Sequence, residues 1–312
     1  MAGGLYALVD LDGVVEYVLS KRGSDGGYLS FQYMDMFESS VEDTFYTLSI
    51  LSTLKVDPPQ ADATIGFLRR LQDPSGGYRS VEVAYYSLLA LDLLGAKPAD
   101  PEGAARFLLQ ALEATLAEQN GHAWLLLDEK PLIDEKGVLR SKDATYIITP
   151  ADVTPWLNRV SMIVLALDKL GGMADRYAEA AAAAMLKSRN GGGFGHPVPQ
   201  LEYTYWAVEG LSALHRFDTP AETVKWVLAC ENESGGFSAT PYSRNYFVEN
   251  LYYGLKTLQK LGSSPRYARS HLRYVSSLQN ANGGFRRTTT HGVSSLEYTF
   301  YAIESLKTLG LV

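Results

Sequence analysis

The sequence predicts an all-α protein in which paired helices close into a ring, and three observations lead to this fold class. Apolar residues recur at helical spacing through most of the chain. A glycine pair followed by an aromatic residue recurs between the helical segments. The repeating unit spans about forty to fifty residues, which is the size of one helix pair.

Five turns share the glycine pair and mark the ends of helices. They are SDGGY ending at Tyr28, LQDPSGGY ending at Tyr78, SRNGGGF ending at Phe194, CENESGGF ending at Phe237 and LQNANGGF ending at Phe285. Glycine reaches the positive φ values that a sharp reversal needs. Each turn therefore predicts the end of one helix and the start of the next.

The segments on either side of these turns complete a helix pair. A segment before a turn carries an apolar stripe, such as Ile65, Leu68 and Leu71. The segments after the turns open with an acid and then two aromatic residues: VEDTFYTLSIL, VEVAYYSLLAL, LEYTYWAVEGL, VENLYYGLKTL and LEYTFYAIESL.

One repeat, the third, is irregular. Residues 101–118 and the segment TPWLNRVSMIVLALDKL supply its helices, and residues 120–153 interrupt them. β-Branched residues and an Asp-Glu-Lys-Gly turn predict that this insertion is a hairpin or flap. Counting this repeat gives six helical hairpins in a single domain of residues 1–312, and six pairs can close into a ring that buries the faces an open solenoid must cap.

Composition narrows the class of function. The formal charge of −7 argues against nucleic acid as the main partner, because phosphate binding needs a basic surface. The single cysteine, Cys230, cannot form an internal disulfide, and we interpret it as a small buried hydrophobic residue. With neither a basic leader nor an apolar run of about eighteen residues, we expect a cytoplasmic protein with no transmembrane segment.

The Gln-x-x-x-Gly-Gly-aromatic turn is similar to the repeat shared by protein prenyltransferase β subunits and squalene-type terpenoid cyclases. Gln72 and Gln279 keep its glutamine, and Arg22, Ser188 and Glu231 replace it. The resemblance covers essentially the whole chain. It implies an α/α toroid whose second helices surround a deep apolar lumen for an isoprenoid. The cyclases carry two such domains, so length favours the β-subunit comparison.

The resemblance also locates metal positions. Protein prenyltransferases bind a catalytic zinc through Asp-x-Cys in the penultimate repeat and His in the last. These positions fall on Phe247, Glu249 and Tyr298 here. Because aromatic side chains rarely bind zinc, we expect no zinc and no other resident cofactor, with Mg²⁺ entering only together with a diphosphate.

Squalene-type cyclases instead protonate an alkene with the middle Asp of an Asp-x-Asp-Asp-Thr motif. Residues 40–44, SVEDT, are similar to this motif but lack its first Asp, which makes Glu42 and Asp43 the candidate catalytic acids. Structural roles compete with this interpretation, because Ser39-x-x-Glu42 and Ser294-x-x-Glu297 also match capping boxes. An acid recurs at the same place in the other repeats, where a ring of carboxylates could bind a cation or raise one another's pKa: Glu82, Glu202, Glu249 and Glu297.

The aromatic pairs predict a belt around an apolar cavity, with ordinary core packing as the alternative. The candidate residues for binding the isoprenoid tail are Tyr46, Tyr86, Tyr205, Trp206, Tyr253, Tyr298 and Tyr301. The candidates for binding a diphosphate at the mouth are basic loop residues, with solvated surface charge as the alternative: His196, Arg244, Arg287 and His291.

These observations favour an isoprenoid-binding enzyme of the prenyltransferase type that acts on an isoprenyl diphosphate. A single-domain terpene cyclase that uses Glu42 and Asp43 as acid is one alternative, and a non-catalytic toroid that binds a lipid or a partner is another. The resemblance to β subunits implies a helical-repeat protein partner. An apolar loop is expected to form a lid or to meet a partner, and it holds Phe31, Tyr33, Met34, Met36 and Phe37.

Overall fold

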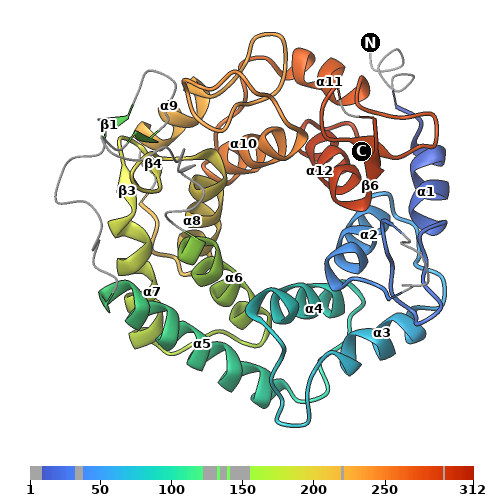
Figure 1. Ribbon diagram of the computed structural model, residues 1–312, viewed down its shortest axis with the longest axis vertical. Coiled ribbons are helices and arrows are strands. Elements are labelled where there is room, and N and C mark those ends of the chain that lie inside the picture. The colour runs from blue at the N-terminus through green and yellow to red at the C-terminus, as the bar shows by residue number, and fades with distance from the viewer. Residues whose placement is uncertain are drawn as a thin grey trace.

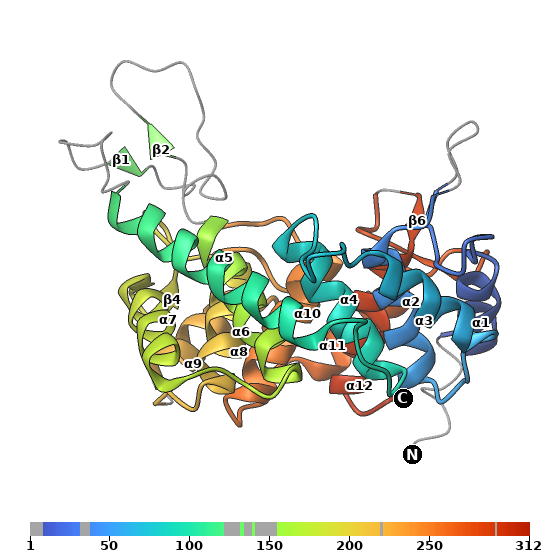
Figure 2. The ribbon, with the colours of Figure 1, turned by 90° about the horizontal axis from the view of Figure 1, so that it is seen from below.

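Two concentric rings of helices make up the computed structural model (Figure 1). It describes residues 9–31, 38–121, 132–133, 139–140, 155–218, 221–290 and 292–312. Within these ranges the chain forms twelve helices, and a view from the side shows that the ring is much wider than it is thick (Figure 2). None of these helices is both long enough and apolar enough to cross a lipid bilayer.

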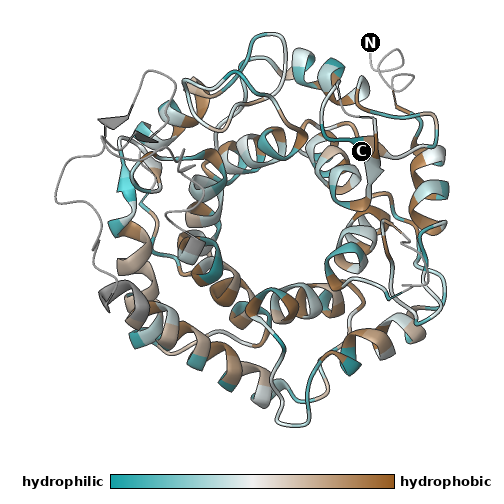
Figure 3. Cartoon of the chain, in the orientation of Figure 1, coloured by the Kyte–Doolittle hydropathy of each residue, from teal (hydrophilic) through white to brown (hydrophobic). Residues whose placement is uncertain are grey.

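Inner and outer helices alternate along the chain, as the six predicted hairpins require. The outer ring holds α1 (Leu11–Leu19), α3 (Ala61–Arg70), α5 (Pro101–Gly121), α7 (Asp175–Lys187), α9 (Ala221–Ala229) and α11 (Ala268–Ser276). The inner ring holds α2 (Val41–Thr53), α4 (Val81–Leu93), α6 (Pro155–Lys169), α8 (Leu201–Ala213), α10 (Val248–Lys260) and α12 (Leu296–Thr308). The all-α toroid is confirmed. Apolar residues of both rings pack between them, as the colouring of Figure 3 shows.

In the described part of the chain, the paired strands are two-residue pieces. In the fourth repeat β3 (Arg189–Asn190) pairs with β4 (Gly193–Phe194), and in the last β5 (Phe285–Arg286) pairs with β6 (Ser294–Ser295). Within the predicted insertion of residues 120–153, β1 (Leu132–Ile133) pairs antiparallel with β2 (Leu139–Arg140), as a hairpin would. Most of that insertion, and with it the expected flap, lies outside the described residues.

Three of the five glycine turns are anchored by a threonine to the inner helix that follows them. The backbone N–H groups of Tyr28, Phe194 and Phe285 donate to threonine hydroxyls of the inner helices at 3.0 Å, and these three aromatic side chains are fully buried. Gly283 adopts a φ of 84°, and a Cβ there would lie 1.9 Å from the carbonyl oxygen of Gly13 in α1. The glycine is therefore required both by the turn and by the close approach of the first helix.

The motif glutamine, where it is present, ties its turn to the next outer helix. Gln72 accepts a hydrogen bond from Asp100 N at 2.8 Å and donates to Asp100 O at 2.6 Å. Gln279 makes the same pair of bonds with Asp10, both at 2.8 Å, and so joins the last repeat to the first. α12 also packs against α2, where the hydroxyl of Thr53 donates to Glu304 at 2.6 Å. The ring is therefore closed, as expected.

The helix caps differ from the predicted capping boxes by one residue. Ser40 and Ser295, the second residue of each serine pair, cap α2 and α12 by accepting from Asp43 N and Tyr298 N. Ser39 instead donates to Asp25 at 2.6 Å, and Ser294 donates to Asn282 at 3.0 Å. The capping-box prediction is wrong because the first serine of each pair is taken by its glycine turn.

Candidate functional site

The inner helices place equivalent residues in layers across the lumen. Their amino termini lie at the same end of the ring, so residues at the same helical position occupy the same level. The second position supplies an acidic layer of Glu42, Glu82, Glu202, Glu249 and Glu297. The fifth and sixth positions supply an aromatic belt of Phe45, Tyr46, Tyr85, Tyr86, Tyr205, Trp206, Tyr252, Tyr253, Phe300 and Tyr301. The ninth position supplies a lower charged layer of Glu209, Lys256 and Glu304.

The aromatic belt fills the lumen with its own rings. Ring centroids lie 5.0 Å apart for Tyr46 and Phe300, and 5.0 Å apart for Tyr205 and Tyr253. Across α6, which carries no ring at this level, Tyr85 and Trp206 meet at 5.7 Å. Eight of the ten rings are buried, namely those of Tyr46, Tyr85, Tyr205, Trp206, Tyr252, Tyr253, Phe300 and Tyr301.

The expectation of an open apolar cavity is therefore wrong at this level. Both rings of a pair meet rings of other inner helices: in α10, Tyr253 packs against Tyr205 and Tyr252 packs against Tyr301. Ten rings then take up the space that a ligand would need.

The tyrosine hydroxyls of the belt form hydrogen-bonded pairs. The hydroxyl oxygens of Tyr46 and Tyr86 lie 3.2 Å apart, as do those of Tyr253 and Tyr301. The hydroxyl of Tyr301 also donates to Glu297 at 3.4 Å. Burial raises the pKa of Tyr86 to about 12, although its bond to Tyr46 lowers it. The hydroxyls therefore stay protonated at neutral pH and can both donate and accept.

The acidic layer concentrates negative charge above the belt. Burial raises the pKa of Glu202, and the nearby Glu249 raises it further, while a 2.9 Å hydrogen bond from Asn158 opposes this. Burial also raises the pKa of Glu297, again with a contribution from Glu249, while Arg287 opposes it. These carboxylates thus disfavour one another's ionisation, which the sequence had left as one of two interpretations.

Arg287 is the diphosphate candidate that reaches this layer, and it is already paired. Its Nε donates to Glu249 at 2.7 Å, and its guanidinium carbon lies 4.2 Å from the centre of the Phe247 ring. Tyr298, half-buried on α12, is close enough to Arg287 and Glu297 for both charges to act on its pKa, which burial raises. Phe247 and Tyr298, the expected replacements of zinc ligands, therefore lie at the same mouth as Glu249.

The other basic candidates lie in the loops that lead to α8 and α10, or are not described. The Nε2 atom of His196 lies 3.2 Å from the carbonyl oxygen of Lys187 at the end of the outer helix α7. Arg244 is exposed in the loop before α10. His291 falls outside the described residues. Within the described ranges, no three His, Cys, Asp or Glu side chains converge closely enough to hold a metal ion.

The two candidate acids are held by serines. Asp43 accepts hydrogen bonds from the backbone N–H and the hydroxyl of Ser30, both at 2.7 Å, and the hydroxyl oxygen of Ser30 accepts from Leu296 N at 3.0 Å. Burial raises the pKa of Asp43, Ser30 lowers it, and Glu42 raises it. Glu42 accepts from Ser40 at 2.8 Å. Asp43 therefore helps to fix the start of α12 at the point where the ring closes.

The lower charged layer was not predicted. Lys256 donates to Glu304 at 2.7 Å, and Lys260 lies 3.0 Å from Glu209. Burial alone would raise the pKa of Glu304, but Lys256 and Thr53 outweigh it and the pKa falls. The signal was present in the sequence, because residues 209, 256 and 304 follow an aromatic residue by four positions and so lie one turn further along the same helix face.

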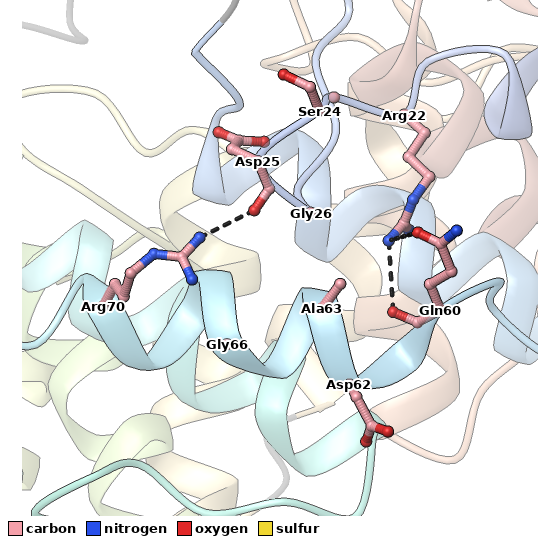
Figure 4. Close-up of a pocket in the computed structure, with 10 residues that line it drawn as sticks. Arg22, Ser24, Asp25, Gly26, Gln60, Asp62, Ala63, Gly66 and Arg70 are labelled. Atoms are coloured by element: carbon pink, nitrogen blue, oxygen red, sulfur yellow. Dashed lines mark hydrogen bonds between the residues drawn. The ribbon is translucent and has the colours of Figure 1, made fainter.

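Outside the lumen, a hollow of about 610 Å³ lies between the first glycine turn and α3 (Figure 4). Arg70 donates to the carbonyl of Asp25 at 2.9 Å, and Arg22 contacts Gln60 at 3.4 Å. Both arginines therefore serve contacts between neighbouring repeats. The hollow marks the place where Arg22 replaces the motif glutamine.

Solved structures share this fold at low sequence identity. Protein geranylgeranyltransferase-I of Candida albicans, in complex with GGPP, is 13% identical over 86% of this chain and 83% of its own, with a TM-score of 0.62. The type II terpene cyclase MstE from Scytonema, in complex with geranylgeranyl dihydroxybenzoate, is 12% identical over 100% and 99%, with a TM-score of 0.61. A protein from Actinoplanes is 15% identical over 96% and 98%, with a TM-score of 0.55.

We expected chain length to favour prenyltransferase β subunits over terpenoid cyclases. It does not, because the cyclase MstE is matched over nearly its whole chain. No curated protein sequence matches this one. A family model described as the prenyltransferase alpha-alpha toroid domain matches residues 6–84, 26–123 and 184–311. These matches span well over half of the sequence and agree with the closed double ring of helices, so the chain belongs to the prenyltransferase alpha-alpha toroid domain family.

Proposed function

We propose that this protein binds an isoprenoid in the lumen of its toroid, and that the tail displaces the aromatic belt when it enters. The observation that carries the proposal is the belt, because five of the six inner helices bring ring pairs to one level of the lumen. Two solved neighbours with the same fold were determined with GGPP and with geranylgeranyl dihydroxybenzoate. Both compounds carry a geranylgeranyl tail, for which a wall of rings is a suitable surface.

Energetics allow the belt to open. Separating the hydroxyl pairs Tyr46–Tyr86, Tyr253–Tyr301 and Tyr205–Tyr252 costs about 1 kcal/mol each. Lost ring contacts add about 0.5–1.5 kcal/mol apiece. Burying a fifteen-carbon tail offers on the order of 10 kcal/mol, at about 0.8 kcal/mol per CH₂. The tail therefore has enough binding energy to rearrange several side chains.

The experiment measures binding of farnesol and geranylgeraniol by titration calorimetry and by thermal shift. If the lumen were open and lined by these rings, Trp206→Ala and Tyr253→Ala would remove contacts to the tail and weaken binding. Because these rings fill the lumen, we expect both variants to bind the tail more tightly than the wild type, since an apolar cavity is then already present. Tyr242→Ala, which removes a tyrosine that is 72% exposed, is the matched control and should change nothing.

Two reaction classes are proposed for such a ligand. Transfer from an isoprenyl diphosphate would use Arg287, with Arg244, His196 and His291, to hold the head group. Cyclisation would use Asp43, whose pKa burial raises, as a general acid. Incubation with geranylgeranyl diphosphate, followed by chromatographic separation and mass spectrometry of the products from wild type and Asp43→Asn, distinguishes the two reactions. Transfer to water or another nucleophile releases diphosphate, whereas acid-initiated cyclisation gives an isomer of the substrate with the same mass and depends on Asp43.

A non-catalytic, partner-binding toroid is the second candidate function, and the filled lumen favours it. Among the residues that the structure describes, three large apolar side chains are exposed in the loops that lead to inner helices, on the same end of the ring as the acidic layer: Phe31, Tyr242 and Val293. Such side chains suit contact with a protein, in line with the helical-repeat partner implied by the resemblance. If neither prenyl alcohol binds to the wild type or to the two cavity variants, the isoprenoid proposal fails and this function replaces it.

A further inference from the structure

We infer that the acidic layer selects the head group of the isoprenoid, accepting a hydrogen-bond donor, above all an ammonium group, and excluding a diphosphate. This inference rests on the proposed function and specifies the substrate class of the same site. It departs from the diphosphate that the basic loop residues suggested.

Charge at the mouth works against a diphosphate. Arg287 already donates to Glu249 at 2.7 Å, so a diphosphate would have to displace that carboxylate to gain the same cation. It would then lie close to Glu297 and Glu202, on which the charge of Glu249 already acts. Bringing two or more further negative charges into this half-buried layer is unfavourable.

The unsatisfied polar atoms of the layer point the same way. Oε2 of Glu249 and Oδ1 of Asn158 are both buried and have no hydrogen-bond partner among the described residues. Asn158 is oriented by its other atom, because Nδ2 donates to Glu202 at 2.9 Å. Both unsatisfied atoms are acceptors, and leaving a buried acceptor unpaired costs about 1–3 kcal/mol. A ligand that donates hydrogen bonds relieves this cost, whereas a fully ionised diphosphate offers only acceptors.

These atoms form one continuous arc. Asn158 on α6 bonds to Glu202 on α8, and Glu202 is close enough to Glu249 on α10 for the two charges to act on each other. The tyrosines of the belt lie directly beneath, since Tyr301 reaches Glu297 and the charge of Glu202 acts on Tyr253. An ammonium group would thus meet carboxylates on one side and aromatic rings on the other, both of which attract a cation.

The test compares three ligands that share one tail: geranylgeranylamine, geranylgeraniol and geranylgeranyl diphosphate. We expect the wild type to bind the amine most tightly and the diphosphate at least about tenfold more weakly than the amine, which is about 1.4 kcal/mol. Glu202→Gln should reduce the preference for the amine. Glu249→Gln should do the same and also raise affinity for the diphosphate, because it frees Arg287.

The control is Glu222→Gln on α9, which removes a carboxylate that is 78% exposed on the outer ring and should leave all three affinities unchanged. Tightest binding of the diphosphate by the wild type would overturn the inference and leave the proposed function standing. So would equal amine binding by the wild type, Glu202→Gln and Glu249→Gln. Failure of all three ligands to bind would overturn the proposed function, and the inference with it.

Discussion

Ring closure can be tested with two glutamines that make the same bonds in different places. Gln279→Ala removes the bonds that join the last repeat to Asp10, and Gln72→Ala removes the equivalent bonds to Asp100 within the chain. Each glutamine also donates to a carbonyl of its own glycine turn, at 3.0 Å for Gln279 and 2.7 Å for Gln72. The two variants therefore lose matched sets of three hydrogen bonds.

The magnitudes follow from the bonds and the chain between them. Three bonds at a net value of about 0.5–1.5 kcal/mol each predict a loss of about 1.5–4.5 kcal/mol in either variant, nearer the lower end where the groups stay hydrated. The tie at Gln279 spans 269 residues and the tie at Gln72 spans 28. Because the tie at Gln279 joins opposite ends of the chain and the tie at Gln72 joins neighbouring repeats, α1 should separate from the ring more readily when its tie is cut.

Hydrogen exchange measured by mass spectrometry, together with urea unfolding, checks this reasoning. In Gln279→Ala we expect faster exchange confined to α1 and the adjacent last turn, under conditions where the inner helices stay protected. In Gln72→Ala the stability loss should be similar, without selective exposure of α1. Unchanged protection of α1 in Gln279→Ala would show that the ring does not depend on this tie.

Three further predictions concern the charged layers and the seam. Burial and Glu249 raise the pKa of Glu297, so this carboxyl group binds its proton more strongly in the native protein than in the unfolded chain. The free energy of unfolding therefore falls as the pH rises from the pKa of Glu297 in the unfolded chain through its pKa in the native protein. Glu297→Gln should therefore raise Tm at pH 7.5, with a smaller gain at pH 4; equal gains at both would contradict the charge argument. Ser30→Ala should cost about 2–4 kcal/mol in urea unfolding, because it removes a hydroxyl bonded to both Asp43 and Leu296 N. Lys256→Met should cost about 1–3 kcal/mol, because Glu304 loses its shortest ion pair and keeps only Thr53 and the more exposed Lys307 as partners. The double variant Lys256→Met/Glu304→Leu should recover most of this cost, and no recovery would place the cost in packing.

The fold could be predicted because the turn chemistry repeats. Glycine pairs, buried aromatic residues and the motif glutamine recur at fixed spacing, and each answers a local requirement that the structure displays. The predicted N-cap of α2 was one residue too early, because either of two adjacent serines, Ser39 and Ser40, could cap the helix. Sequence alone does not show that the first of them is bonded to Asp25 in the turn.

The candidate site was less predictable, because it depends on how far apart the inner helices lie. The sequence placed the aromatic pairs at one level, but only the packing of six helices decides whether the rings line a space or fill it. The loops posed the same difficulty. Arg287 and Arg244 are both exposed residues of similar loops, and the sequence does not show that Arg287 pairs with Glu249.

Trp206 gives the aromatic belt an optical signal of its own. Its ring lies 5.7 Å from that of Tyr85 and 5.3 Å from that of Tyr205, and it is almost fully buried. Light absorbed by these tyrosines should pass to the indole, whose emission should lie at the short wavelengths typical of an apolar site. A ligand that pushes the rings apart changes both the transfer and the emission wavelength. Because the chain has four tryptophans, the difference in emission between the wild type and Trp206→Phe isolates this signal, so opening of the lumen can be followed in unlabelled protein.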